Sequence, residues 1–139
     1  MRFFGRVFRD GKFWLVEIPI LDLMTQGRTK EEAYRMAADI IETLVNRPGF
    51  SVSIHKGKNG HFEISSNNLR CMVALLLRRR REASGLTLAE VAFRLGTKSR
   101  NAYARYEQGS SVPTVEKLVQ LLSAVSPESD FVLSYSTAA

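Results

Sequence analysis

A short polar stretch in the C-terminal half carries side chains that could form paired hydrogen bonds with a flat polar partner. It contains Lys98, Ser99, Arg100, Asn101 and Arg105. Arginine can donate two hydrogen bonds to O6 and N7 of guanine, and asparagine can pair with N6 and N7 of adenine. Lys98 and Ser99 suit phosphate oxygens, which the N-terminus of a helix also attracts. These residue types therefore predict contact with nucleic acid.

Arg81 and Thr87, which precede this stretch in the chain, are further candidates for DNA contact. Residues 78–81 are four consecutive arginines, which point all round a helix, so at most one or two can face one partner. We expect Arg81 to contact a phosphate and the other three to be solvated. Thr87, which begins the next predicted helix, is the second candidate.

The residues that could support catalysis or metal binding are dispersed. The candidate carboxylates are Glu17, Asp22, Asp39 and Glu63. Metal-dependent cleavage of a phosphodiester needs several carboxylates that converge on cations, and this spacing predicts no such cluster. His55 and His61 flank one turn and could face each other, but a zinc site lacks a third ligand there. Cys71 lies in a predicted apolar helix, where we expect it in the core. We therefore expect no catalytic residue, no metal site, no cofactor and no enzymatic activity.

The composition sets limits on the class of protein. The 139 residues are 45% apolar and 24% charged, which predicts a globular chain with one domain or two small ones. The net charge of +6 favours a polyanionic partner. Residues 1–68 hold ten basic and eight acidic side chains and residues 69–139 hold ten and six, so the C-terminal half is more basic. One cysteine, no apolar signal segment and no run long enough for a bilayer predict a cytoplasmic protein without membrane contact.

Two short predicted helices and a tight turn position the polar stretch. Thr87 and Glu90 form a capping box at the start of the first helix. Its apolar face consists of Leu88, Val91, Ala92 and Leu95. Gly96 ends this helix, because glycine adopts a left-handed backbone at little cost. Ser99 caps the second helix, and its buried side carries Tyr103 and Tyr106.

Further predicted helices flank this pair, at residues 69–83 and 114–125. Together the four helices predict a helix-turn-helix domain with a polar second helix that can enter a DNA major groove. After Ser126-Pro127, an alternating segment predicts a strand over residues 130–136 without a partner in its own domain. Such a strand invites pairing with a second copy of the chain across a two-fold axis. The expected dimerisation residues are Phe131, Val132, Leu133, Ser134 and Tyr135.

The N-terminal half has a different pattern. Asp10-Gly11 separates two runs rich in aromatic and β-branched residues, at residues 2–9 and 12–18, and predicts a hairpin. A very short strand around Met24 and Thr25 precedes a helix capped by Thr29. The apolar stripe of this helix is Ala33, Met36, Ala37, Ile40, Ile41, Leu44 and Val45. Two more alternating strands follow, before a polar linker at residues 65–68.

The predicted fold class is therefore α+β followed by all-α. Residues 1–66 form a small sheet with one packed helix, and residues 67–139 form a helix-turn-helix domain with a C-terminal dimerisation strand.

The helical half resembles the phage-repressor type, or XRE-like, helix-turn-helix domain. The residues that carry the resemblance are REASGLTLAEVA at 81–92, Gly96, and RYEQGSSVPTVEKLVQLLSAV at 105–125. The turn is one residue longer than the usual pattern, and tyrosines replace aliphatic residues in the recognition helix.

The N-terminal half, together with the helix-turn-helix, resembles a HicB-type antitoxin. The matching features are the hairpin RFFGRVFRDGKFWLVEIP and the motif Thr-Gln-Gly-x-Thr-x-x-Glu-Ala at residues 25–33. Residues 21–24 are Leu-Asp-Leu-Met, where the family usually has a Pro-Gly pair. The resemblance implies a degenerate RNase H-like fold for residues 1–66.

The resemblance implies an antitoxin of a type II toxin–antitoxin system. Such a protein neutralises a HicA-like, mRNA-cleaving toxin and binds its own operator DNA as an autorepressor. The implied assembly is a homodimer, and a higher oligomer with the toxin is left open. One alternative is a helix-turn-helix repressor whose N-terminal domain senses a small molecule. Another is an RNA-processing enzyme that uses the RNase H-like half.

Overall fold

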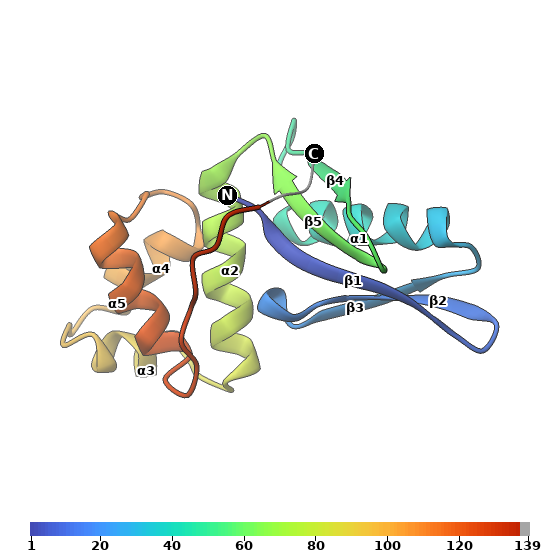
Figure 1. The fold of residues 1–139 in the computed structure, drawn as a ribbon. Helices are drawn as coiled ribbons and strands as arrows, with labels where there is room; N and C mark the ends of the chain where they lie inside the picture. Colours follow the sequence, from blue (N-terminus) through green and yellow to red (C-terminus); the bar gives the residue numbers. More distant parts are fainter. Residues whose placement is uncertain (137–139) are drawn as a thin grey trace. The chain divides into compact units, whose positions relative to one another are not determined.

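The computed structural model describes residues 1–136, which divide into two compact units (Figure 1). Unit 1 comprises residues 1–69 together with Tyr135 and Ser136, and unit 2 comprises Arg70–Ser134. The sequence places a boundary between residues 66 and 67 and assigns the whole C-terminal segment to the second domain. In the structure Ser136 instead hydrogen-bonds Glu63 and Arg2, so the last two described residues belong to unit 1.

Unit 1 combines a five-stranded sheet with one long helix, as the α+β prediction requires. Its elements are β1 (Phe3–Asp10), β2 (Phe13–Ile18), the 3-10 turn η1 (Pro19–Leu21), β3 (Leu23–Gly27), α1 (Lys30–Val45), β4 (Val52–Lys56) and β5 (His61–Ser66). The strand order is β3-β2-β1-β5-β4, and every neighbouring pair is antiparallel. The predicted hairpin forms at Asp10-Gly11, where Gly11 has a φ of +60°. In this strand order β1 is the central strand, between β2 and β5.

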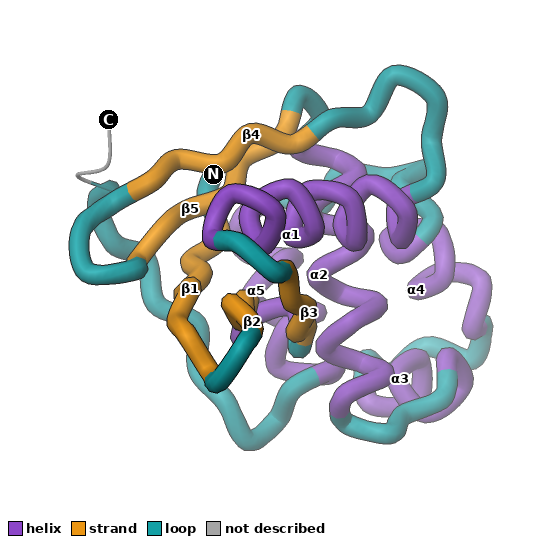
Figure 2. The backbone as a smooth tube through the Cα atoms, turned by 90° about the vertical axis from the view of Figure 1, so that its right-hand side faces the viewer, coloured by secondary structure: helices purple, strands orange, loops and turns teal. Residues whose placement is uncertain are grey.

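Helix α1 covers one face of this sheet (Figure 2). Its buried side chains are Ala33, Tyr34, Ala37 and Ile41. Tyr34 was absent from the predicted stripe, yet its ring meets Phe62 edge-on at a centroid distance of 5.4 Å. Met36, predicted to face inward, is 37% exposed. The buried side of α1 is thus rotated toward Tyr34 relative to the predicted stripe, because the Phe62 ring of the sheet packs against Tyr34.

The motif at residues 25–33 is the junction between β3 and α1. A Cβ on Gly27 would lie 2.5 Å from the backbone nitrogen of Ala33, so only glycine permits this close crossing. Thr29 Oγ1 accepts a hydrogen bond from the Glu32 amide at 3.1 Å, which confirms the predicted cap. The Glu32 carboxylate in turn accepts from the Arg28 amide at 2.6 Å. The motif residues therefore determine how the helix leaves the sheet.

Unit 2 contains four helices. They are α2 (Leu69–Ala83), α3 (Leu88–Arg94), α4 (Arg100–Glu107) and α5 (Val115–Val125). All seven residues from Cys71 to Leu77 are buried, as are Val91, Tyr103, Leu121 and Val125. The helix predicted at residues 69–83 is confirmed, and α5 starts one residue after Thr114, whose side chain caps it.

The segment after α5 forms no strand within the single chain over residues 130–136. Val132, Leu133 and Tyr135 are 86%, 96% and 101% exposed. A strand whose only partner is a second copy would also be unpaired in one chain, so dimerisation through this segment stays a prediction.

Candidate nucleic-acid interface

Helix α3 starts at the capping box that the sequence predicts. Thr87 Oγ1 accepts from the Glu90 amide at 3.1 Å, and the Glu90 carboxylate accepts from the Thr87 amide at 3.4 Å. Val91 and Ala92 are buried and anchor the helix in unit 2. The hydroxyl of Thr87 is thus engaged as an acceptor at an exposed helix start.

The turn between α3 and α4 is closed by backbone hydrogen bonds. Gly96 has a φ of +75°, and its amide donates to the Phe93 carbonyl at 3.0 Å. The Thr97 amide donates to the Ala92 carbonyl at 3.0 Å. This pair of bonds is a Schellman motif, which satisfies the last carbonyls of α3. The Thr97 hydroxyl then accepts from the Ser99 amide at 3.2 Å, so the path from α3 to α4 is held at each end.

Helix α4 has one buried and one exposed side. Tyr103 and Ala104 are buried, whereas Tyr106, predicted to be buried, is only half-buried. With 3.6 residues per turn, Asn101, Ala102 and Arg105 share the opposite side, and all three are exposed. Arg105 lies at the centre of this side, and Ala102, at its edge, was not among the predicted contacts. An alanine methyl can contact the methyl group of thymine.

The remaining predicted DNA contacts lie at the start of α4 and are exposed. Arg100 falls on the same helical side as the buried Tyr103, but it is exposed because it stands in the first turn. Ser99 is the N-cap residue, as predicted, yet its side chain makes no capping hydrogen bond. Ser99 and Lys98 therefore lie at the positive end of the helix dipole, where anions bind.

Arg81 already has partners within unit 2. Its Nε and Nη2 donate to the Glu107 carboxylate at 2.7 and 2.9 Å, and its Nη1 donates to the Leu86 carbonyl at 2.9 Å. The side chains of Arg81 and Glu107 are only 16% and 7% exposed. Arg81 thus forms an interior ion pair that holds the last turn of α4 against α2, and its phosphate contact stays a prediction.

The electrostatics of this ion pair follow from its burial. The hydrogen bonds that Arg81 donates to Glu107 raise the pKa of Arg81 above its ordinary value, so the guanidinium stays charged. Burial, and then the negative charge of Glu107, raises the pKa of Tyr103 far above its usual range. Tyr103 is consequently a neutral core residue at any physiological pH.

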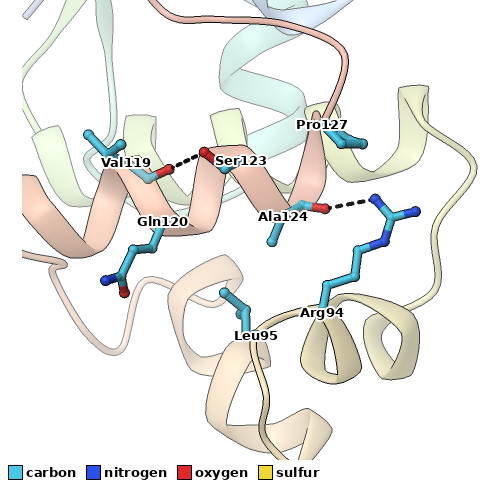
Figure 3. Close-up of a pocket in the computed structure, with 7 residues that line it drawn as sticks. All are labelled: Arg94, Leu95, Val119, Gln120, Ser123, Ala124 and Pro127. Atoms are coloured by element: carbon cyan, nitrogen blue, oxygen red, sulfur yellow. Dashed lines mark hydrogen bonds between the residues drawn. The ribbon is translucent and has the colours of Figure 1, made fainter.

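A groove of about 780 Å³ lies elsewhere in unit 2, between the end of α3 and α5 (Figure 3). Arg94 Nη1 donates to the Ala124 carbonyl at 3.3 Å there. A cation at the C-terminus of a helix satisfies its last carbonyls and opposes its dipole. The arginine in this groove thus stabilises the end of α5.

The candidate catalytic carboxylates do not converge. Glu17 pairs with Arg6 at 2.7 Å and Glu63 with Arg2 at 3.2 Å. Asp22 ends η1 in a left-handed conformation, and Asp39 is exposed on α1. The histidines also have separate partners, since His55 Nε2 lies 2.7 Å from Ser65 Oγ and the His61 ring contacts the Phe4 ring at a tilt of 37°. Within residues 1–136, no three His, Cys, Asp or Glu side chains gather as metal ligands would.

Comparison with known families agrees with the geometry of unit 2. Residues 77–125 match the helix-turn-helix family, a span from the middle of α2 to the end of α5. The comparison with curated proteins gave no match. Within residues 1–136, no helix combines the length and the apolar character that crossing a bilayer requires. Residues 77–125 are therefore an XRE-like helix-turn-helix domain, which supports a DNA-binding transcription regulator.

Proposed function

We propose that α4 lies in the major groove of operator DNA and reads base edges through Asn101, Ala102 and Arg105. The observation that carries this proposal is the exposed side of α4, which combines a bidentate amide, a methyl group and a guanidinium on one short helix. Lys98 and Ser99 contact phosphates at the helix start and set its register. The Schellman turn and the Arg81–Glu107 pair hold the helix in place before DNA arrives.

Selection from a random duplex library, followed by fluorescence anisotropy with the selected duplex, tests this assignment. Asn101→Ala or Arg105→Ala should cost about 1–3 kcal/mol of binding free energy and flatten sequence preference. Lys98→Ala should weaken all duplexes similarly and reduce the salt slope by about one unit. The control is Lys117→Ala, which removes a cation from α5, outside the proposed interface. Wild-type selectivity in the Asn101 and Arg105 variants would contradict the proposal.

We also propose that two copies bind DNA together through the segment at residues 131–135. The support is the exposure of its apolar side chains, Val132 and Leu133 above all. Two-fold pairing would place the half-sites about 34 Å apart or a multiple of that distance. Leu133→Asp should give a monomer in light scattering and weaken DNA binding, since the linked sites lose their effective concentration. A wild-type protein that stays monomeric at high micromolar concentration would refute this assembly.

We propose further that the protein acts in the cytoplasm as the antitoxin of a type II system, with unit 1 neutralising a HicA-like, mRNA-cleaving toxin. Support comes from the hairpin and from the motif at residues 25–33, whose Gly27, Thr29 and Glu32 each have a defined part in the β3–α1 junction. The roles of these three residues at the junction explain the motif through the fold of unit 1.

Co-purification from the native operon, with a growth-rescue assay, tests the antitoxin proposal. A small basic protein should co-purify, and its expression alone should stop growth and degrade mRNA. The Asn101→Ala/Arg105→Ala variant should still rescue growth, because its changes lie in unit 2. If no toxin is encoded beside the gene and a small molecule alters DNA affinity instead, the protein is a ligand-sensing repressor.

A further inference from the structure

The sheet of unit 1 leaves one face uncovered by α1. We call this the outward face, and the strand register defines it. Its residues are Phe4, Arg6 and Phe8 on β1, Phe13, Leu15 and Glu17 on β2, Met24 and Gln26 on β3, His55 on β4, and His61, Glu63 and Ser65 on β5. The opposite face carries Val7, Val16, Phe62 and the other buried side chains beneath α1.

Exposed aromatic rings lie on the outward face, Phe4 on the central strand and Phe13 at the hairpin end. Phe4 is 48% and Phe13 39% exposed, which is unusual for phenylalanine on a sheet. The rings of Phe4 and His61 lie 5.1 Å apart, and the Arg6 guanidinium lies 4.7 Å from the centroid of Phe8. The central strand therefore alternates cation and ring along one face, from Arg2 to Phe8.

The carboxylates beside these rings form ion pairs with arginines on the same face. Glu17 pairs with Arg6 at 2.7 Å, and Glu63 accepts hydrogen bonds from Arg2 and Ser136. These bonds, Ser136 first and then Arg2, lower the pKa of Glu63, so it stays paired near neutral pH. Asp10, the remaining acid of β1 on this face, lies at the far hairpin end. Lys58, in the turn after β4, adds an exposed cation.

A hollow of about 460 Å³ adjoins Phe4 on this face. Its lining includes the rings of Phe4 and His61, together with Lys58 and the arginine-paired Glu63. Aromatic walls with a cation at the edge suit a nucleobase and its phosphate, because every base has a face that stacks and a backbone that is anionic.

We propose that the outward face of unit 1 binds single-stranded nucleic acid, with one base stacked on Phe4 in the hollow and a phosphate near Lys58. This activity is separate from duplex reading by α4.

Anisotropy with labelled single strands tests the proposal on the full chain. The probes are uridine and adenosine RNA oligomers and thymidine DNA oligomers of about 12 nucleotides, at low salt. Phe4→Ala should weaken binding about 5- to 100-fold, whereas Phe4→Trp, which retains a stacking face, should stay within about threefold. Phe93→Ala, which removes an 83% exposed ring in unit 2, is the matched control and should have no effect. Lys58→Ala should reduce the salt slope by about one unit.

The outcomes separate this proposal from the function of α4. The RNA and DNA arms show which strand is the ligand, and duplex affinity measured in parallel should be unchanged in Phe4→Ala. Absence of single-strand binding, or equal losses in Phe4→Ala and Phe93→Ala with the fold intact by circular dichroism, would overturn it. A further outcome also overturns the proposal: the wild type binds no single strand, and a protein that co-purifies with it is lost in Phe4→Ala. The outward face would then be a protein-docking surface.

Discussion

Replacing Arg81 with methionine should destabilise unit 2 by about 2–4 kcal/mol, because the Glu107 carboxylate would be left without its cation. The size follows from the surroundings of the pair. Truncating one partner of a fully buried pair costs about 3–5 kcal/mol, and an exposed pair contributes about 0–1 kcal/mol. The side chains of Arg81 and Glu107 are 16% and 7% exposed and share two hydrogen bonds, so the expected cost lies nearer the buried limit.

Urea unfolding measures this cost on the full chain. Far-UV circular dichroism follows the helices, most of which lie in unit 2, and the fluorescence of Trp14 follows unit 1 in the same sample. The double variant Arg81→Met/Glu107→Leu should recover most of the loss, since two apolar side chains replace two interior charges. The Trp14 transition should stay at its wild-type midpoint.

Two results would refute the interior assignment of Arg81. The first is a loss below about 0.5 kcal/mol in Arg81→Met, as for a surface residue. The second concerns DNA: if Arg81 contacts a phosphate, the stable double variant should lose about one unit of salt slope. We expect its slope to be unchanged.

Three further predictions concern the helix caps, the β3–α1 junction and the response to acid. Thr114→Ala should lower the free energy of unfolding by about 1 kcal/mol, because Thr114 Oγ1 accepts a hydrogen bond from the Lys117 amide. Ser99→Ala should leave the stability in urea unchanged, since the Ser99 side chain makes no capping hydrogen bond. Equal losses in the two variants would contradict the geometry of α4. Gly27→Ala should destabilise unit 1 by about 1–3 kcal/mol in Trp14-monitored unfolding, because its Cβ would meet the backbone of Ala33; Gly11→Asn, in open space, is the tolerated control. The lowered pKa of Glu63 stabilises the fold above the unfolded value near 4.5, and this contribution disappears as the pH falls through the folded value. Glu63→Gln should therefore be less stable than wild type at neutral pH, by less than about 1 kcal/mol, and should match it in acid; a constant difference at all pH values would exclude this linkage.

Local features of this chain could be predicted from the sequence because they depend on neighbouring residues. The capping box at Thr87 and the cap at Thr29 act within one helical turn. The Asp10-Gly11 turn and the end of α3 at Gly96 depend on a left-handed backbone at one residue. The helix-turn-helix could likewise be predicted, since it combines such short-range signals at fixed spacings.

The role of Arg81 could not be predicted, because it depends on a residue 26 positions away in the chain. In the sequence Arg81 is one of four consecutive arginines, and the neighbouring residues do not indicate which of the four pairs with a distant carboxylate. Packing of α4 brings Glu107 to Arg81 and makes that arginine an ion-pair partner. The inward turn of Tyr34 has the same origin, since it depends on where β5 places Phe62.

The outward face also required the tertiary structure, although its residues were visible from the start. Alternation shows that Arg2, Phe4, Arg6 and Phe8 share one side of a strand, but apolar residues lie on both sides of β1. Only the packing of α1 against Phe62 and Val7 decides which side is covered. Burial is a property of the assembled layers, whereas side-chain direction along a strand is a property of the chain. The sequence therefore determined the pattern, and the fold determined which half of it is left uncovered by α1.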